Sequence, residues 1–169
     1  MTDSNTLIEV RDLAVEFVTG SLKQRVLEHV SFDIKRGETL ALVGESGSGK
    51  SVTAHSILRL LPYPLAQHPS GSIHYAGQDL LKLNENKLRG IRGNRIAMVF
   101  QEPMTSLNPL HSIEKQINEV LALHKGLRGK AATARTLELL ELVGIPEPRK
   151  RLKAYPHELS GGQRQRVVI

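Results

Sequence analysis

Residues 44–51 read GESGSGKS, with the spacing G-x-x-x-x-G-K-S that is typical of loops binding the phosphates of a nucleotide. The glycines allow successive backbone N–H groups to point into one concavity, and the N-terminus of a following helix adds about half a positive charge. The ammonium of Lys50 can reach β- and γ-phosphate oxygens, and the hydroxyl of Ser51 suits Mg²⁺. We therefore expect a nucleoside triphosphate, with Mg²⁺, to bind Gly44, Glu45, Ser46, Gly47, Ser48, Gly49, Lys50, Ser51 and Val52. The loop alone does not distinguish kinases, GTPases and ATPases.

The sequence on either side of this loop predicts a strand before it and a helix after it. Residues 39–43 (TLALV) form a short apolar run of the kind found in strands that are buried on both faces. Residues 50–61 (KSVTAHSILRLL) predict a helix that Pro62 ends. A phosphate loop is expected in this context, between a buried strand and a helix.

The rest of the N-terminal part predicts mostly strands. Residues 7–18 and 26–34 alternate apolar and polar positions, which predicts an antiparallel pair. Residues 72–81 predict a hairpin that turns near Ala76-Gly77, and residues 96–100 (IAMVF) predict a second buried strand.

The C-terminal part, from residue 104 to 159, predicts helices. Apolar residues at helical spacing follow Ser112 and end near Gly126, and a second helix ends at Gly144. Ser160 and Gln163 have the S-x-x-Q spacing of a capping box, so a further helix should begin there. Gly161 and Gly162 would leave its first amides uncovered, which makes a second anion-binding helix terminus.

Composition and charge limit the function classes. The chain has 169 residues and a formal net charge of +6, which favours anionic partners such as nucleotides, nucleic acid or acidic lipid. It has no cysteine, which excludes disulfides, cysteine-bound zinc and iron–sulfur clusters within these residues. We expect no export signal at the N-terminus, and no apolar run approaches the roughly 18 residues of a membrane span.

Residues 159–163 read LSGGQ, and with them the chain resembles the ATP-binding cassette (ABC) family. The order of an antiparallel region, phosphate loop, glutamine loop (Gln101-Glu102-Pro103), helical region and signature agrees with that family. Residues 98–110 (MVFQEPMTSLNPL) and 155–167 (YPHELSGGQRQRV) resemble, more narrowly, the ATPases of oligopeptide, dipeptide and nickel importers, including the N-terminal cassette of microcin C-type peptide importers.

The resemblance implies an α/β fold: an incomplete phosphate-loop NTPase core with an N-terminal antiparallel β subdomain and an inserted α-helical subdomain. Residues 1–103 would form the β subdomain and part of the core, residues 104–160 the helical subdomain, and residues 160–169 the start of the signature helix.

The resemblance also implies roles for residues outside the phosphate loop. Gln101 would bind Mg²⁺ together with Ser51 and would contact the attacking water. Phe17 would stack on adenine, although packing in the core explains Phe17 nearly as well. In the family two cassettes pair head to tail, so that each signature caps the nucleotide of the other. The signature residues expected to act in this way are Ser160, Gly161, Gly162 and Gln163.

The expected function is that of the ATPase subunit of a peptide importer at the cytoplasmic face of the cell membrane. Its partners would be transmembrane permease subunits, contacted through the glutamine loop and helical subdomain, a second cassette in another chain or in tandem, and, indirectly, a periplasmic binding protein. Family members continue past the signature helix into a strand ending in Asp-Glu, whereas this sequence stops at Ile169. We therefore expect these residues to bind ATP without appreciable hydrolysis, and to expose an apolar sheet edge.

Two other function classes stay open. A soluble ABC-type ATPase acting on nucleic acid would use the basic residues Arg89, Arg92 and Arg95 and the run at 149–153. Such runs are usually solvated faces, and no aromatic residues alternate with them, so we expect no nucleic-acid partner. A phosphate-loop kinase of small molecules would leave LSGGQ unexplained.

Overall fold

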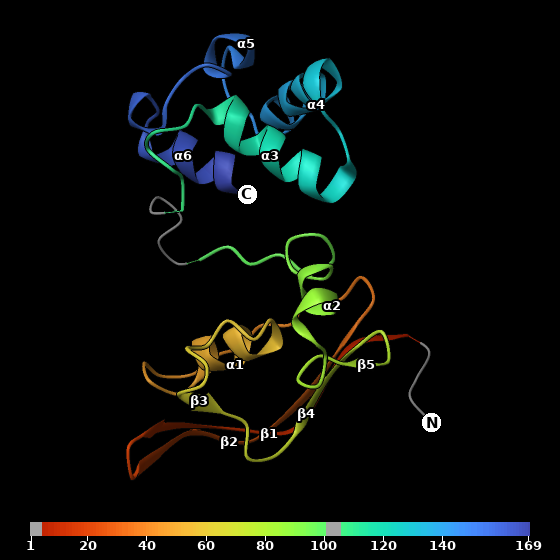
Figure 1. Cartoon of the computed structure of the whole chain (residues 1–169), viewed down its shortest axis with the longest axis vertical. Helices are drawn as coiled ribbons and strands as arrows, with labels where there is room; N and C mark the ends of the chain where they lie inside the picture. Colours follow the sequence, from red (N-terminus) through yellow and green to blue (C-terminus); the bar gives the residue numbers. More distant parts are fainter. Residues whose placement is uncertain (1–4, 101–105) are drawn as a thin grey trace. The chain divides into compact units, whose positions relative to one another are not determined.

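The computed structural model of the chain describes residues 5–100 and 106–169, and its fold is α/β. The chain divides into two compact units, Met1–Ile96 and Ala97–Ile169. The first unit holds an antiparallel sheet and the helices α1 (Lys50–Ile57) and α2 (Glu85–Arg89), whereas the second is built from helices (Figure 1).

The sheet of the first unit is organised around two long antiparallel strands. These are β1 (Thr6–Thr19) and β2 (Leu22–Lys35). The other edge of β1 pairs with β3 (Ala66–Gln67) and β4 (Ser72–Tyr75), and β5 (Gln78–Asp79) adds to β4. The order β2-β1-β4-β5 confirms the expected antiparallel pair, and the turn between β4 and β5 confirms the expected hairpin.

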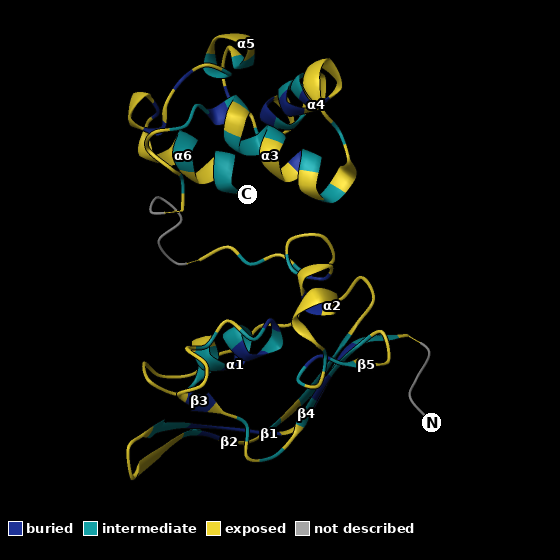
Figure 2. Ribbon diagram, viewed as in Figure 1, coloured by how far each residue is buried: buried dark blue, intermediate teal, exposed yellow. Residues whose placement is uncertain are grey.

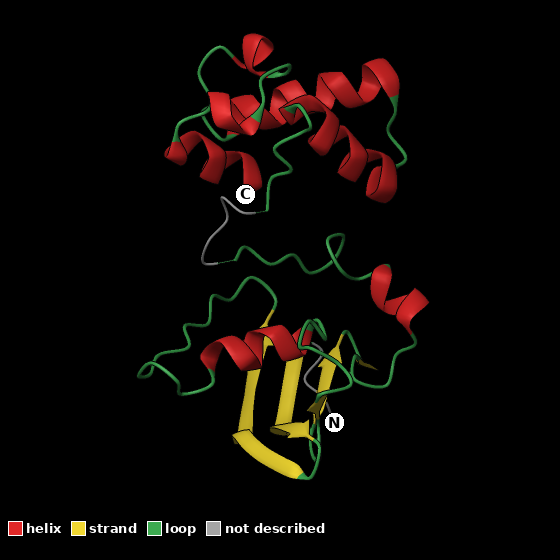
Figure 3. Ribbon diagram, turned by 60° about the vertical axis from the view of Figure 1, so that its left-hand side comes forward, coloured by secondary structure: helices red, strands yellow, loops and turns green. Residues whose placement is uncertain are grey.

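The core of the first unit lies on the face of the sheet that α1 covers (Figure 3). Val10, Leu13 and Val15 of β1 are fully buried, together with Ile73 of β4 and Leu80. Buried residues follow β1 through the middle of the sheet in Figure 2. The buried face of the sheet is therefore the surface on which α1 packs, and the loop before α1 lies against β2.

The two strands that the sequence predicts beside the phosphate loop and before Gln101 do not form. Residues 39–43 are coil with Leu42 43% and Val43 92% exposed, and residues 97–100 are coil with Phe100 47% exposed. Ile96 makes an isolated bridge with Arg92. A strand buried on both faces needs hydrogen-bonded neighbours, and no strand among the described residues pairs with either segment.

The helix after the phosphate loop is shorter than predicted. It ends at Ile57 rather than at residue 61, because Arg59 adopts a left-handed conformation with φ 50°. The amide of Leu60 then donates to the carbonyl oxygen of His55 over 2.9 Å, which closes the helix end. Pro62 therefore follows the end of the helix instead of causing it.

The second unit is a compact set of helices. They are α3 (Ile113–Lys125), α4 (Gly129–Leu142), α5 (Pro148–Arg151), the 3₁₀ turn η2 (Pro156–Glu158) and α6 (Gly161–Val168). Their core joins buried residues of α3, α4 and the segment before α6, namely Ile113, Leu140, Ile145, Ala154 and Leu159.

The helix ends predicted in the second unit are confirmed. Ser112 caps α3 by accepting from the amide of Lys115, and Gly126 ends it with φ 68°. Gly144 follows α4 with φ 70°, the conformation expected after a helix C-terminus. Within residues 5–100 and 106–169, no helix is long and apolar enough to cross a membrane.

Candidate functional site

The loop at residues 44–49 takes its shape from glycines. Gly47 and Gly49 have φ 84° and 88°, in the left-handed region that other residues rarely adopt. A Cβ atom on Gly44 would lie 2.7 Å from Oγ of Ser48, and one on Gly49 would lie 2.6 Å from Cδ1 of Leu27 in β2. The loop therefore folds back tightly on itself and packs closely against the sheet.

The side chain of Lys50 folds over this loop. Its Nζ donates to the carbonyl oxygens of Gly44, over 2.8 Å, and Glu45, over 2.6 Å, and it lies 3.3 Å from Oγ of Ser48. One cation is thus held against the carbonyl groups at the start of the loop, within reach of any anion that approaches the loop amides.

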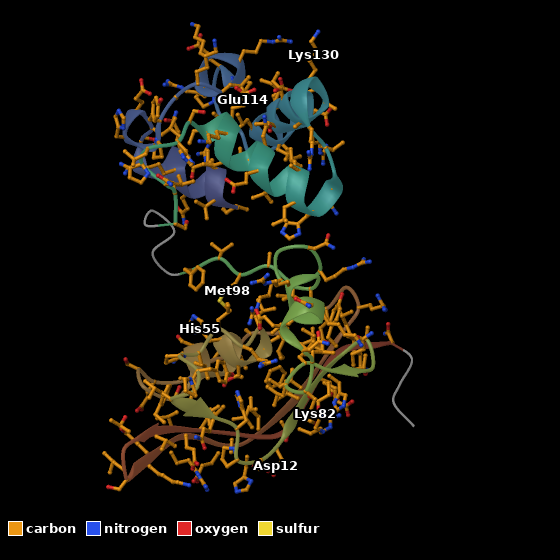
Figure 4. The ribbon with its side chains drawn as sticks, viewed as in Figure 1. Asp12, His55, Lys82, Met98, Glu114 and Lys130 are labelled. Atoms are coloured by element: carbon orange, nitrogen blue, oxygen red, sulfur yellow. The ribbon has the colours of Figure 1, made fainter. Side chains whose placement is uncertain are left out.

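The start of α1 adds to the positive character of the loop. Gly49 is the N-cap and has no side chain to occupy the first amides, and the first turn contains no acidic residue. Ser51 lies exposed in this first turn. Its carbonyl oxygen accepts a hydrogen bond from Nδ1 of His55, the α1 residue labelled in Figure 4, over 2.6 Å.

Buried hydroxyls are satisfied by carbonyl groups at the start of α1, and apolar side chains hold the helix on the core. Thr53 and Ser56 are buried, and their hydroxyls donate to the carbonyl oxygens of Gly49, over 2.9 Å, and Val52, over 2.7 Å. Val52 and Ile57 pack against the hydrophobic core of the sheet. The helix that carries Lys50 and Ser51 is therefore held as one body with the sheet.

These residues suit a polyphosphate and a hard cation. Glycines let the loop fold tightly, Gly47 leaves open space beside its backbone, and an uncapped helix terminus and an ammonium supply positive charge. Mg²⁺ takes hard oxygen ligands, and the exposed Ser51 hydroxyl is one that this loop could offer beside waters and phosphate oxygens. Among residues 5–100 and 106–169 no group of three or more His, Asp or Glu side chains could hold a metal by itself.

The other predicted residues of the nucleotide site have different outcomes. Phe17 is half-buried on β1, in register with Gln24 of β2 and Ala66 of β3, and stacking on adenine stays a prediction. Gln101 lies outside the described residues, so its contact with Mg²⁺ also stays a prediction.

The signature residues begin α6 in the second unit, and the predicted capping box is confirmed. The amide of Ser160 donates to Oε1 of Gln163, and the amide of Gln163 donates to Oγ of Ser160. Gly161 and Gly162 are exposed, and a Cβ atom on Gly162 would meet nothing within 4 Å. Leu159, 3% exposed, anchors the segment in the core of the second unit.

The basic residues considered for nucleic acid are in part engaged inside the protein. The Arg92 guanidinium contacts backbone carbonyl groups after α1, and Lys150 pairs with Glu147. The sequence alone gave no sign of the Arg92 contacts, because its spacing from Arg89 and Arg95 is that of any basic surface segment. The structural role of Arg92 becomes visible only in the folded protein, where its side chain contacts the carbonyl oxygen of Leu58.

Comparison with known proteins agrees with these features. A sequence model of the ABC transporter family matches residues 27–169. The chain is 64% identical over 168 residues to the peptidoglycan transport ATP-binding protein YejF of Agrobacterium fabrum, covering 99% of this chain and 31% of that protein. It is 52% identical to the oligopeptide transport ATP-binding protein OppD of Bacillus subtilis, covering 96% of this chain and 46% of that protein.

Solved structures with the same fold are ATP-binding cassettes. The dimeric, post-hydrolysis structure of the cassette MJ0796 bound to ADP and Pi superposes with a TM-score of 0.80 at 27% identity, and covers 96% of this chain and 67% of that one. The chain thus spans about a third to a half of the length of the curated relatives it matches.

Proposed function

The chain belongs to the ABC transporter family, and from this premise we propose that it binds Mg-ATP and forms part of the ATPase subunit of an importer of peptides or related substrates. The observation that carries the proposal is the glycine loop before α1, with Lys50 folded over its carbonyl groups and an uncapped helix terminus beside it. The names of the relatives, oligopeptide and peptidoglycan transport proteins, support the substrate class.

Each residue of the loop has a task in this proposal. The amides of residues 44–52 bind the phosphate oxygens, and Lys50 exchanges its carbonyl partners for β- and γ-phosphate oxygens. Phe17 stacks on the adenine. Ser51 holds Mg²⁺, and by family resemblance Gln101 joins it and orients a water. Bound Mg²⁺ would neutralise charge that develops on the phosphates.

The signature completes the site of a second cassette. Phosphate oxygens would meet the free amides at the start of α6, where the capping box holds Ser160 and Gln163 in a fixed geometry. The dimeric state of the cassette MJ0796 supports this arrangement. The second cassette is either another chain or a tandem part of the same polypeptide.

We also propose partners and a location, which the family supports. Residues 1–103 are proposed as the β subdomain and part of the ATPase core, and residues 104–160 as the helical subdomain that contacts permease subunits at the cytoplasmic face of the cell membrane. A periplasmic binding protein would act indirectly through the permease.

Titration calorimetry with Mg-ATP tests the proposal directly. Lys50→Ala should lower the affinity at least tenfold, because it removes the cation that faces the phosphates. Lys130→Ala, on the exposed start of α4, is the matched control and should bind as the parent does. Equal affinity of the parent and Lys50→Ala for Mg-ATP would refute the assignment of the loop.

A second experiment tests whether the signature of one cassette contacts the nucleotide bound by another. Ser160→Arg should leave ATP binding to one cassette unchanged and abolish ATP-dependent pairing, because a bulky cation replaces the capping hydroxyl. Sedimentation with and without Mg-ATP measures the pairing. ATP-dependent dimers of the Ser160→Arg protein would contradict the role given to α6.

A further inference from the structure

The C-terminal end of α1 is held by a side chain from another part of the first unit. Leu58 is the C-cap of α1 and Arg59 follows it, so their carbonyl oxygens lie just past the end of the helix. Arg92, which follows α2, supplies the donors: its Nε lies 2.8 Å from the Leu58 oxygen and its Nη2 lies 2.9 Å from the Arg59 oxygen.

The Arg92 guanidinium is itself fixed from the other side. Its Nη1 donates to Oε1 of Glu85, at the start of α2, over 2.6 Å, and its side chain is 26% exposed. All three donor atoms of the guanidinium are therefore used, in the planar fork geometry that only arginine has. A lysine could satisfy at most part of this set.

A second arginine joins the same two segments in the opposite direction. Nη1 of Arg59 donates to the carbonyl oxygen of Leu83 over 2.6 Å, and its guanidinium lies 5.8 Å from the centre of the Tyr63 ring. Arg92 reaches from the α2 segment to the end of α1, and Arg59 reaches back. We call the contacts of Arg92 and Arg59 with Leu58, Leu83 and Glu85 the arginine brace.

The brace and a close contact with β2 hold the two ends of α1. At the N-terminal end, Gly49 lies so close to Leu27 and Val26 of β2 that a Cβ atom would collide with the Leu27 side chain. At the C-terminal end, the brace ties α1 to the segment around α2 (Figure 1). The helix has eight residues and is about 12 Å long, so a shift at one end tilts the whole element.

We propose that Arg92 is a positioning residue for the phosphate loop: by holding the end of α1 it fixes where Lys50 and Ser51 stand relative to the loop carbonyls. The inference rests on the proposed binding of Mg-ATP. A misplacement of about 1 Å at groups that act on a ligand can cost up to a hundredfold in function, so a tilted α1 would weaken the phosphate contacts. Arg92 itself touches no phosphate.

The test compares ATP with AMP as ligands of the natural protein. Arg92→Gln should lower the affinity for Mg-ATP about five- to tenfold and the affinity for AMP by much less, because AMP lacks the β- and γ-phosphates that Lys50 meets. A purely structural role would lower both affinities by the same factor, through loss of folded protein. Arg92→Lys should fall between the parent and Arg92→Gln.

Two further variants keep the result interpretable. Glu85→Gln removes the ion pair and leaves the contacts with Leu58 and Arg59, so a folded protein with a smaller loss of ATP affinity is expected even if Arg92→Gln does not fold. Arg95→Gln, in the same basic segment and exposed, should bind ATP as the parent does.

The outcomes separate the two proposals. Parent-like ATP affinity in both Arg92→Gln and Glu85→Gln, or equal losses for ATP and AMP, would overturn the positioning role while the Lys50→Ala result still supports the binding site. Failure of the parent protein to bind Mg-ATP would overturn both.

Discussion

Ser160 and Gln163 exchange two hydrogen bonds at the start of α6, one of 3.0 Å from the amide of Ser160 and one of 3.3 Å from the amide of Gln163. The cap uses the amide of Gln163, and so it does not occupy those of Gly161 and Gly162. The first turn is thereby held in helical form while Gly161 and Gly162 stay exposed. A helix terminus of this kind is ordered before any ligand arrives.

Loss of this cap should loosen α6. Ser160→Ala is expected to cost about 1 kcal/mol of local stability, because it removes the acceptor for the Gln163 amide. Hydrogen exchange at the amides of residues 164–168 measures the effect. Ser160→Thr keeps the hydroxyl and is the control, and equal exchange in the alanine and threonine variants would mean that the cap does not hold the helix.

The two left-handed glycines of the phosphate loop should respond differently to alanine. Gly49→Ala combines φ 88° with a Cβ atom 2.6 Å from the Leu27 side chain, so a loss of about 2–3 kcal/mol of unfolding free energy is expected. Gly47→Ala has φ 84° and open space, so it should cost about 1 kcal/mol.

Urea denaturation of both variants and of Leu27→Ala gives the double-mutant cycle. If the collision with Leu27 matters, Gly49→Ala and Leu27→Ala will be less than additive, whereas Gly47→Ala and Leu27→Ala will add. Additive effects at position 49 would show that backbone strain alone explains the cost.

The features that the sequence predicted correctly are helix ends, which depend on residues close to one another in the chain. The caps at Ser112 and Ser160, and the glycine after α4, follow from side chains and backbone within a few positions. The strands expected at 39–43 and 96–100 were wrong, because a buried strand depends on partners distant in sequence. The arginine brace was missed for the same reason, since Arg92 meets Leu58 only after folding.

The end of α1 could not be predicted from nearby residues, even with a proline close to it. Pro62 predicted a stop at residue 61, but the left-handed Arg59 ends the helix earlier and is held there by Arg92 from outside the segment. Tertiary contacts therefore decide where α1 ends.

Stability should fall as the pH rises through the pKa of His29. Nδ1 of His29 lies 2.5 Å from Oδ1 of Asp12 on the exposed face of β1 and β2 (Figure 4 labels Asp12), and this hydrogen bond raises the pKa of His29. Glu28 nearby raises the His29 pKa further, and Arg25 lowers it. A raised folded-state pKa stabilises the fold fully below the unfolded value of about 6.5, and the gain disappears above the folded value.

Proton NMR titration of the His29 ring checks this pH dependence. The midpoint should lie above about 6.5 in the parent, and Asp12→Asn should bring it down. A midpoint that does not change in Asp12→Asn would show that the ion pair does not form in solution.

The effect of a substitution in the exposed apolar segment 39–43 should depend on whether strands pair with this segment. Val43 is 92% exposed, so Val43→Ser should change the unfolding free energy of the 169-residue chain by less than about 0.5 kcal/mol. The relatives are two to three times longer, and the apolar run TLALV is typical of a strand with neighbours on both sides. In a form of the protein where such neighbours are present, the same substitution should cost about 1.5–3 kcal/mol, the value of burying a valine side chain.

Val15→Ala, at a fully buried position of β1, should destabilise both forms by a similar amount and serves as the control. Equal, small effects of Val43→Ser in both forms would show that residues 39–43 stay outside the sheet and that their apolar character has another cause.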